Sequence, residues 1–334
     1  MASTLPRISR ATVFRTLAVA ALAALPFLES NTYWLHVFSV ALIGAVLALG
    51  LQLLVGVAGL LSLGQGAFYG IGAYVAGGLA VSFGAPFLLA LFAGGVAAAL
   101  ASLLLVPIVR LKGSSLAVAT LGFSIIVHLV ILNEDWLTGG SLGLMGIPEP
   151  SILGLHLGTE RAFYWVCLVV LVLVYISLDR LMRSRFGRAL AAISQDEEAA
   201  RASGIAISFY KSKCFLVAAF TAGIAGALYA YHSRYLSPND FTFAKSIEIL
   251  IMVVVGGLGS LPGAVLGAFI VVLMPEYLRS SGELRMILFG LLVVVLMGAG
   301  NRGLVGLMEL ASARIAALLR RSPPPALTPS EQKS

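Results

Sequence analysis

Charged residues are scarce in this chain, and their scarcity decides its class. They make up 11% of the 334 residues, whereas apolar residues make up 59%. Soluble domains carry about 25% charged residues, so this composition excludes an ordinary water-soluble protein. It favours a protein that is embedded in a membrane.

The sequence also lacks the residues that several kinds of site require. Its two cysteines, Cys167 and Cys214, lie on different apolar segments and have neither a disulfide framework nor a metal-binding spacing. There is no Gly-x-x-x-x-Gly-Lys-Ser/Thr phosphate loop, so we expect no ATP hydrolysis by this chain. No catalytic constellation is apparent, so we expect no enzyme activity, no cofactor and no metal.

Long apolar segments are abundant instead. A transmembrane helix needs about 20 apolar residues, and helices satisfy their own backbone in lipid. We expect an all-α polytopic membrane protein of eight to ten transmembrane helices. Several segments are short or glycine-rich, which suggests broken or re-entrant helices, and the pair at 241–277 is left open as two spans or one re-entrant hairpin. The expected spans are 11–28, 34–56, 67–83, 86–109, 114–132, 162–180, 212–231, 241–257, 262–277 and 284–299.

The basic residues predict the orientation. Most of the 22 Lys and Arg residues fall in 7–15, 110–112, 180–213 and 302–333, which the positive-inside rule assigns to the cytoplasm. We therefore expect a cytoplasmic N-terminus (1–10), a membrane domain (11–300) with a cytoplasmic loop at 181–211, and a cytoplasmic tail (301–334) with a disordered end. The first segment is expected to be an uncleaved helix rather than a secretory signal. The net charge of +7 reports topology and not a nucleic-acid surface.

The polar loop, residues 181–211, is the most informative segment. Ser194 followed by Glu197 fits a capping box, with Ser194 as the N-cap of a short helix. Acidic residues then occupy the first turn, where the helix dipole favours them. Gly204 lies where a left-handed residue would end the helix. From spacing alone, a solvated connector between two spans explains the loop equally well.

Five stretches in order resemble one transporter family. The loop reads GRALAAISQDEEAARASGI (187–205) and contains EAA-x-x-x-G, the pattern by which permeases of bacterial ABC importers dock their ATPases. The others read GLLSLGQGAF (59–68), LAVATLGF (116–123), TGGSLGLMGIP (138–148) and VGGLGSLPG (255–263). Together they resemble the LivM-type permeases of high-affinity branched-chain amino acid ABC importers. The long Pro-rich tail and Asn301 depart from the family pattern.

This resemblance implies a function and a set of partners. It implies a permease subunit in the bacterial inner membrane that works by alternating access with a homologous second permease, two ABC ATPases and an extracytoplasmic binding protein. Branched-chain amino acids are the implied cargo, with urea or short amides as the alternative; an ion-coupled secondary transporter is the rival if the chain works alone. The implied ATPase-coupling residues are Glu197, Glu198, Ala199, Ala200 and Gly204.

Two glycine-rich segments also have a meaning of their own. Residues 59–64 and 257–262 are similar to each other and lie in opposite halves of the chain. Glycine-interrupted apolar segments in both halves indicate broken helices that line a pathway. Each is followed by a small-residue step, Gly66 to Gly70 and Gly263 to Gly267, which favours close helix packing. Packing alone remains the simpler explanation of any single glycine.

Few polar residues fall within the apolar segments. Such residues usually face the bundle interior or a water-filled path. Thr120, Ser124 and His128 are spaced four apart and share one helical face, although a lone histidine there more often bonds a neighbouring helix. Glu248 is expected to pair with Lys245. The pathway candidates are Gln52, Ser62, Gln65, Tyr74, Thr120, Ser124, His128, Glu248, Gly257 and Ser260.

Overall fold

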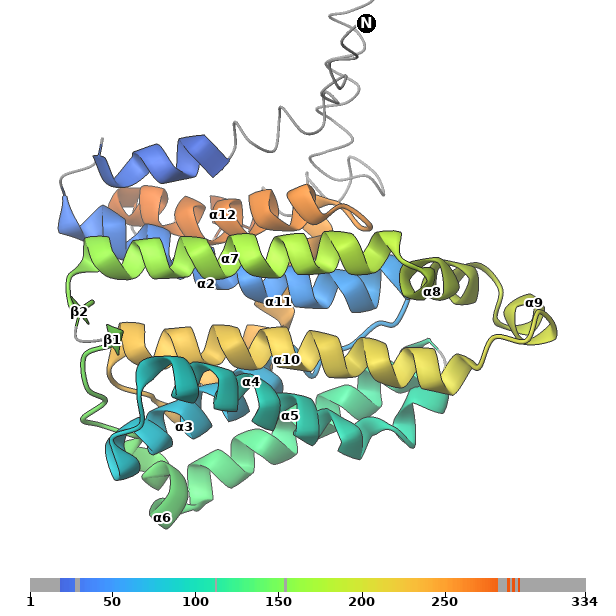
Figure 1. Cartoon of the computed structure of the whole chain (residues 1–334), viewed down its shortest axis with the longest axis horizontal. Helices are drawn as coiled ribbons and strands as arrows, with labels where there is room; N and C mark the ends of the chain where they lie inside the picture. Colours follow the sequence, from blue (N-terminus) through green and yellow to red (C-terminus); the bar gives the residue numbers. More distant parts are fainter. Residues whose placement is uncertain are drawn as a thin grey trace, which may run out of the picture.

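The chain folds as a bundle of helices. The computed structural model describes residues 19–27, 31–111, 113–152 and 155–281, with a few positions between 287 and 294. Nearly all regular structure in these residues is helical; the short strands β1 (Ser151–Ile152) and β2 (Leu155–His156) form one antiparallel hairpin. The long helices run roughly along one axis, with this hairpin at one end and helices α8 and α9 at the other (Figure 1). We call these the hairpin end and the α9 end.

Six of the described helices are long and apolar enough to cross a membrane. They are α2 (Thr32–Gln52, continued by the π-helical turn Leu53–Val57), α3 (Gln65–Phe83), α4 (Phe87–Ser102, continued by the 3-10 turn Leu103–Leu105), α5 (Ser114–Asn133), α7 (Glu160–Arg183) and α10 (Ile207–Ser233). The shorter helices are α6 (Asp135–Thr138), α8 (Arg185–Gln195), α9 (Glu197–Ala202), α11 (Phe243–Gly256) and α12 (Leu261–Tyr277), with 3-10 turns at Ile108–Arg110, Gly140–Leu142, Pro238–Phe241 and Leu278–Ser281. Residues 19–27 are also helical.

The spans expected between 34 and 277 agree with these helices to within a few residues, except 212–231, which lies inside the longer α10. The first expected span, 11–28, is described only in part, from residue 19. The expected termini, 1–10 and 301–334, and nearly all of the last span, 284–299, lie outside the described residues. The expectation of an all-α polytopic membrane protein is therefore confirmed for the part of the chain described here.

Local signals set several helix ends. The Asn31 side chain accepts a hydrogen bond from Tyr33 N at 2.9 Å and caps α2. Thr159 caps α7 in the same way through Ala162 N at 3.3 Å. Gly84 ends α3 in the left-handed conformation, with φ 59°, where glycine lacks the steric penalty of other residues. These caps satisfy backbone groups that a helix end would otherwise leave without partners.

Helices α2 and α10 form the centre of the bundle. In the apolar 18-residue stretch of each helix, 78% of the residues of α2 and 72% of those of α10 are buried. Small residues let the backbones of α3 and α10 touch: a Cβ on Gly72 of α3 would lie 2.2 Å from Gly223 O of α10, and one on Gly226 of α10 would lie 2.0 Å from Tyr69 O of α3. Backbone contact of this kind is how helices associate in membranes, where van der Waals packing replaces the hydrophobic effect. Any side chain at these glycines would separate the helices.

The expected small-residue steps also pack closely. A Cβ on Gly66 would lie 2.8 Å from Ser246 Oγ, and one on Gly267 would lie 1.9 Å from Met252 O. Glycine at these positions therefore joins α3 to α11 and α11 to α12. The expectation that these small-residue steps favour close helix packing is confirmed.

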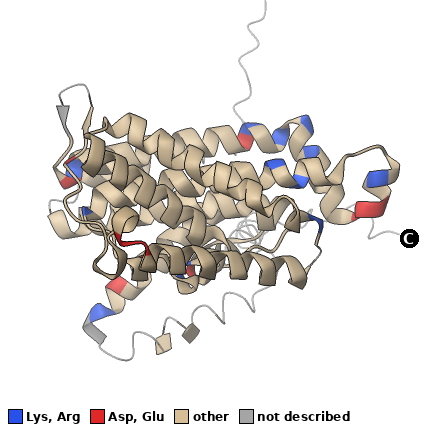
Figure 2. Cartoon of the chain, turned by 90° about the horizontal axis from the view of Figure 1, so that it is seen from below, with Lys and Arg blue, Asp and Glu red and all other residues tan. Residues whose placement is uncertain are grey.

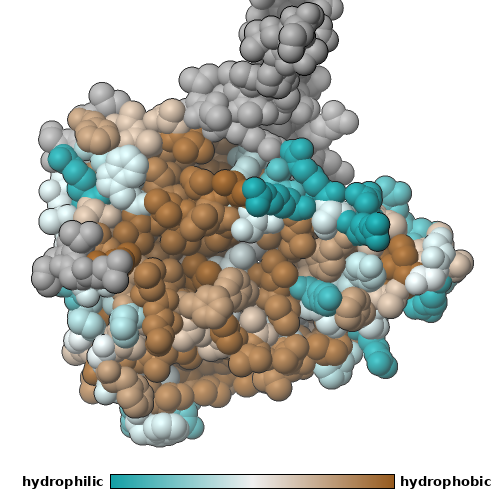
Figure 3. Space-filling view, in the orientation of Figure 1, coloured by the Kyte–Doolittle hydropathy of each residue, from teal (hydrophilic) through white to brown (hydrophobic). Residues whose placement is uncertain are grey.

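The outside of the bundle is apolar around its middle. Large apolar side chains are exposed on several helices, among them Leu88, Phe92, Leu104, Val118, Ile126 and Leu173. Figure 3 shows a broad hydrophobic band between more polar ends, and Figure 2 shows Lys and Arg gathered mainly at the α9 end. Exposed apolar surface of this extent marks a membrane-facing region. The chain is a multi-pass membrane protein.

Helix α12, with the turn before it, runs the length of α2. At the hairpin end the Tyr277 ring of α12 lies 4.8 Å from the Trp34 ring of α2, centroid to centroid. At the α9 end a Cβ on Gly56 would lie 2.6 Å from Gly259 N, in the turn between α11 and α12. Helix α12 and this turn therefore extend from one end of a membrane-length helix to the other, whereas α11 has only 14 residues.

Candidate functional site

The polar loop forms two ordered helices at the α9 end. Ser184 separates α7 from α8 and caps α8, accepting a hydrogen bond from Phe186 N at 3.1 Å. Helix α8 is amphipathic and buries Gly187, Leu190 and Ile193. A Cβ on Gly187 would lie 2.0 Å from Met182 O, so glycine allows α8 to fold back closely against the end of α7. The loop therefore begins as a packed extension of the bundle.

The N-cap of α9 is Asp196, so the predicted capping box at Ser194 is wrong. Asp196 has extended backbone angles, and its Oδ1 accepts hydrogen bonds from Glu198 N at 2.8 Å and Ala199 N at 3.1 Å. Ser194 lies in the last turn of α8, where its hydroxyl donates to Ala191 O at 2.9 Å. The prediction failed because α8 continues to Gln195, which leaves Asp196 as the residue between two helices.

The predicted helix stop at Gly204 is confirmed. Gly204 has φ +80°. Ile205 N donates to Ala200 O at 3.1 Å and Gly204 N donates to Arg201 O at 3.0 Å, which is the bond pattern of a Schellman motif. Ile205 then packs against a small cluster of buried residues, Ile193, Ala200 and Ile207. The stop thereby joins α9 to α8 and to the start of α10.

A buried ion pair fixes the start of α9. Lys211 Nζ of α10 pairs with Glu197 Oε1, and the Lys211 side chain is only 2% exposed. Breaking a buried pair by removing one partner costs about 3–5 kcal/mol, because the other charge stays buried. Lys211 was not among the sequence candidates, since nothing in its local spacing points to Glu197; a lysine at the start of an apolar helix was the only signal.

Helix α8 lies against both glycine-rich breaks, residues 58–64 (the first break) and 257–260 (the second break). A cleft of about 380 Å³ is lined by Ala58, Gly59, Leu60, Gly113, Leu116, Ile193, Ser194, Gln195, Asp196, Glu197, Glu198 and Lys211. A second hollow, of about 330 Å³, includes Gly56, Arg188, Ala191 and Gly259. A displacement of α8 would therefore change the surroundings of both breaks, and a displacement of α9 would change those of the first break.

The second break also lies against the end of α2, just before the first break. Gln52 Nε2 donates a hydrogen bond to Gly257 O at 3.1 Å. Gly257 and Gly259 have φ values of 112° and 83°, which permit the sharp reversal between α11 and α12. Ser260 then caps α12 by accepting from Gly263 N at 3.2 Å. The candidates Gln52, Gly257 and Ser260 are thus brought to one place.

Other candidates surround the first break. Thr120 Oγ1 accepts a hydrogen bond from Leu63 N at 2.9 Å, and Ser62 Oγ accepts from Gly64 N at 3.3 Å. Gln65 Nε2 donates to Ala218 O at 3.1 Å. These side chains satisfy or anchor backbone at the point where the chain turns back and starts α3. Ser62, Gln65 and Thr120 therefore lie together.

Several buried polar atoms have no hydrogen-bond partner in the described part of the chain. Among them, at the sequence candidates, are Oε1 of Gln52 and Gln65, Ser124 Oγ and His128 Nδ1. Buried polar atoms usually have a partner, so these atoms mark the places in the bundle where a polar ligand or water would gain a hydrogen bond. Ser124 and His128 thus share this property with the two glutamines.

Tyr74 and Glu248 have different roles from these groups. The Tyr74 hydroxyl donates to Leu236 O at 3.3 Å, in the segment that follows α10. Glu248 forms the expected ion pair with Lys245, whose Nζ lies 3.0 Å from each of its carboxylate oxygens. Neither residue contacts the breaks through these bonds.

Comparison with known proteins places the chain in a family. The profile of the family described as "Branched-chain amino acid transport system / permease component" matches residues 33–297. The permease protein LivM of the high-affinity branched-chain amino acid transport system of Escherichia coli K12 is 37% identical over 329 residues, which cover 90% of this chain and 77% of that protein.

More distant relatives are permeases too. LivH, a second permease protein of that transport system in Escherichia coli K12, is 25% identical over 280 residues, covering 76% of this chain and 88% of LivH. The autoinducer 2 import permease LsrC of an Enterobacter species is 30% identical over 189 residues, about half of each chain. No solved structure gave a significant match. The chain belongs to the family of permease components of branched-chain amino acid transport systems.

Proposed function

We propose that this chain is the membrane permease of an ABC importer that moves branched-chain amino acids, and that its polar loop is the site where an ATPase drives it. One observation carries the proposal: α8 and α9 stand at the charged end of the bundle, where α8 shares a cleft with each break and α9 shares the cleft at the first break. Family membership supports the transport role.

The coupling follows from how α9 is held. Glu197 and Glu198 lie in its first turn, Ala199 and Ala200 in its middle, and Gly204 ends it. The Lys211 pair and the cluster around Ile205 make this unit move with α8 and α10. ATP-driven closure of two ATPases would push α9, and α8 would transmit the movement to the breaks at the end of α2. Alternating access is the resulting mechanism.

The pathway is proposed to pass beside the two breaks. Unpartnered buried oxygens of Gln52 and Gln65 offer acceptors for an amino acid's ammonium group. The first turns of α3 and α12, which begin just after the breaks, present helix N-termini that favour a carboxylate. The surrounding apolar residues suit the side chains of Leu, Ile and Val. Ser62, Thr120 and Ser260 shape the backbone here rather than select the substrate.

The proposed topology has ten spans with both termini in the cytoplasm. Helices α11 and α12 count as two spans in this proposal: α12 extends along α2 from the α9 end to the hairpin end, and α11 carries the chain from the segment after α10 to the turn at the α9 end. The α9 end, which carries most of the basic residues, is then cytoplasmic, and the hairpin end is extracytoplasmic. Residues 11–300 form the permease domain, 181–211 the cytoplasmic coupling loop, and 1–10 and 301–334 the cytoplasmic ends of a bacterial inner-membrane protein.

The proposed partners follow from the family. LivM and LivH are both permease proteins of one transport system, so a homologous second permease is expected beside this chain. Two ATPases supply the energy, and an extracytoplasmic binding protein delivers the substrate. Urea or short amides are the alternative cargo, because the pathway offers few charged groups. An ion-coupled transporter is the rival mechanism.

Site-specific cross-linking tests the coupling proposal. A cysteine replacing Glu198 should form a cross-link with an ATPase subunit. Both native cysteines, Cys167 and Cys214, are buried, so this product would come from position 198. The matched control replaces Trp136, which is 83% exposed at α6 near the hairpin end, and should give no such product. An ATPase adduct from position 136 and none from 198 would reverse the proposed sidedness and the coupling role with it.

A further inference from the structure

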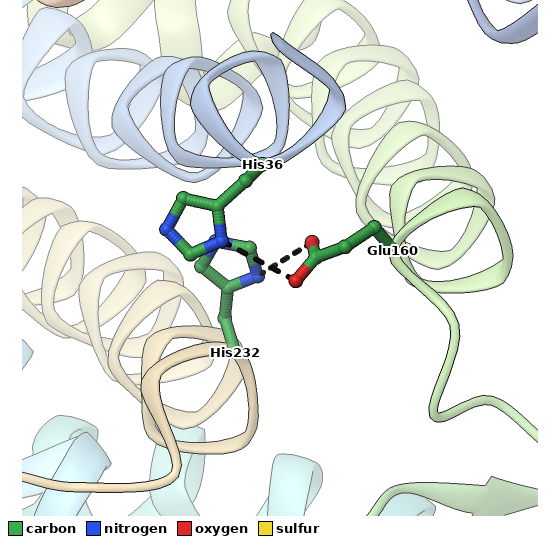
Figure 4. Close-up of side chains that lie close together, drawn as sticks. All are labelled: His36, Glu160 and His232. Atoms are coloured by element: carbon green, nitrogen blue, oxygen red, sulfur yellow. Dashed lines mark hydrogen bonds and ion pairs between the residues drawn. The ribbon is translucent and has the colours of Figure 1, made fainter. Parts of the chain in front are cut away.

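Two histidines and a glutamate meet at the hairpin end, and nothing in the transport mechanism uses them. His36 lies in the first turns of α2, Glu160 is the first residue of α7, and His232 is the penultimate residue of α10. Figure 4 shows their side chains directed to a common point between the three helices. His36 and Glu160 are 124 residues apart in sequence, so no local spacing could reveal the cluster.

The distances suit a small metal ion. His36 Nδ1 lies 3.4 Å from Glu160 Oε1, and His232 Nδ1 lies 4.0 Å from Glu160 Oε2. One ligand atom from each residue lies within 4.8 Å of the others. Ligand bonds of about 2.0–2.2 Å in a tetrahedral zinc site place neighbouring ligand atoms about 3.3–3.6 Å apart. One edge already has this length, and the edge between His232 and Glu160, at 4.0 Å, would have to shorten on binding.

The cluster also contains buried polar atoms that lack a hydrogen-bond partner. Glu160 Oε2 and His232 Nε2 are buried and have no hydrogen-bond partner among the described residues. The His232 side chain is 3% exposed, whereas His36 is 45% and Glu160 31% exposed. An ion could therefore enter from solvent and meet a buried imidazole. The His232 ring is held between the rings of His36, at 4.2 Å, and Phe163, at 5.3 Å.

We propose that His36, Glu160 and His232 bind a transition-metal ion of the zinc type, with water as a fourth ligand. Two imidazoles and one carboxylate with an open position form a ligand set that zinc accepts, and imidazole selects such metals over Mg²⁺ or Ca²⁺. Because each ligand comes from a different helix, the bound ion links α2, α7 and α10 at this end. This site goes beyond the transport function and does not depend on which substrate is carried.

Titration of the full-length chain tests the site. The protein is purified with a tag that contains no histidine, stripped with a chelator and titrated with zinc chloride by calorimetry. We expect one equivalent to bind and the thermal midpoint to rise, since an ion that binds only the folded state stabilises it. His36→Gln and Glu160→Gln should each weaken binding about tenfold or more and reduce the rise in midpoint; both positions are partly exposed, so the variants should fold.

His128→Gln is the matched control, because this histidine lies on α5 and outside the cluster. It should leave zinc affinity unchanged, and Mg²⁺ should give no binding to any variant. Zinc binding that is equally strong in the wild type, His36→Gln and Glu160→Gln would place the ion elsewhere and overturn the proposal. Absence of stoichiometric binding to the folded wild type, checked by size-exclusion chromatography, would overturn it as well.

Discussion

Replacing Gly204 with valine tests whether the stop of α9 matters for transport. Gly204 has φ +80°, and a Cβ there would meet no atom within 4 Å. A side chain at position 204 would therefore act through the backbone conformation and not through steric crowding. An L-residue in the left-handed region costs about 1–2 kcal/mol, and a β-branched residue costs more.

This cost is comparable to what holds the stop together. The two Schellman hydrogen bonds, from Gly204 N and Ile205 N, contribute about 1 kcal/mol each. Helix α9 has six residues and is too short to be stable by itself. A penalty of about 2 kcal/mol changes the ratio of closed to open stop about 30-fold. We expect Gly204→Val to open the stop and release α9 from α8.

The assay is ATP-dependent leucine uptake, with ATPase co-purification and membrane insertion measured in parallel. Gly204→Val should lose uptake and weaken co-purification while inserting normally. Gly204→Asn is the matched control, because asparagine tolerates the left-handed region, and it should keep most activity. Gly78→Ala, which has open space and an ordinary helical backbone, should behave as wild type. Normal uptake by Gly204→Val, or equal failure of Gly204→Asn, would refute the backbone argument.

Two further predictions concern the Glu197–Lys211 ion pair and the contact of α3 with α10. Glu197→Gln should lower the thermal midpoint and uncouple ATP hydrolysis from uptake, because it leaves the Lys211 charge buried without its partner. The double variant with Lys211→Met should recover the midpoint. A double variant that is less stable than Glu197→Gln would contradict the role of the ion pair. Gly226→Val should fail to fold, since its side chain would enter the backbone of Tyr69, and detergent size-exclusion profiles would show this; a monodisperse, active variant would contradict the close contact of α3 with α10.

The membrane helices could be predicted because each uses a local signal. About 20 apolar residues in succession identify a span, and the spans expected between 34 and 277 match helices of the structure. The stop at Gly204 was also local, since glycine after a short helical stretch favours a Schellman motif. The error at Ser194 came from a competing helix: α8 runs to Gln195, so the cap moved to Asp196.

The long-range contacts could not be predicted from one sequence. Lys211 meets Glu197 only because α9 folds back on α10, and Gln52 meets Gly257 only because the turn between α11 and α12 lies at the end of α2. The expectation of no metal rested on the absence of a ligand spacing along the chain. The cluster of His36, Glu160 and His232 is formed by three helices, and such a site leaves no spacing signal.

The central claim is that this chain transports branched-chain amino acids with energy from separate ATPases. The most direct measurement is leucine uptake into proteoliposomes that contain the chain with its second permease and ATPases, with and without ATP and the binding protein. We predict uptake that requires both, is competed by isoleucine and valine, and is absent when this chain is reconstituted alone. Selective uptake by the chain alone, driven by an ion gradient and indifferent to ATP, would contradict the account.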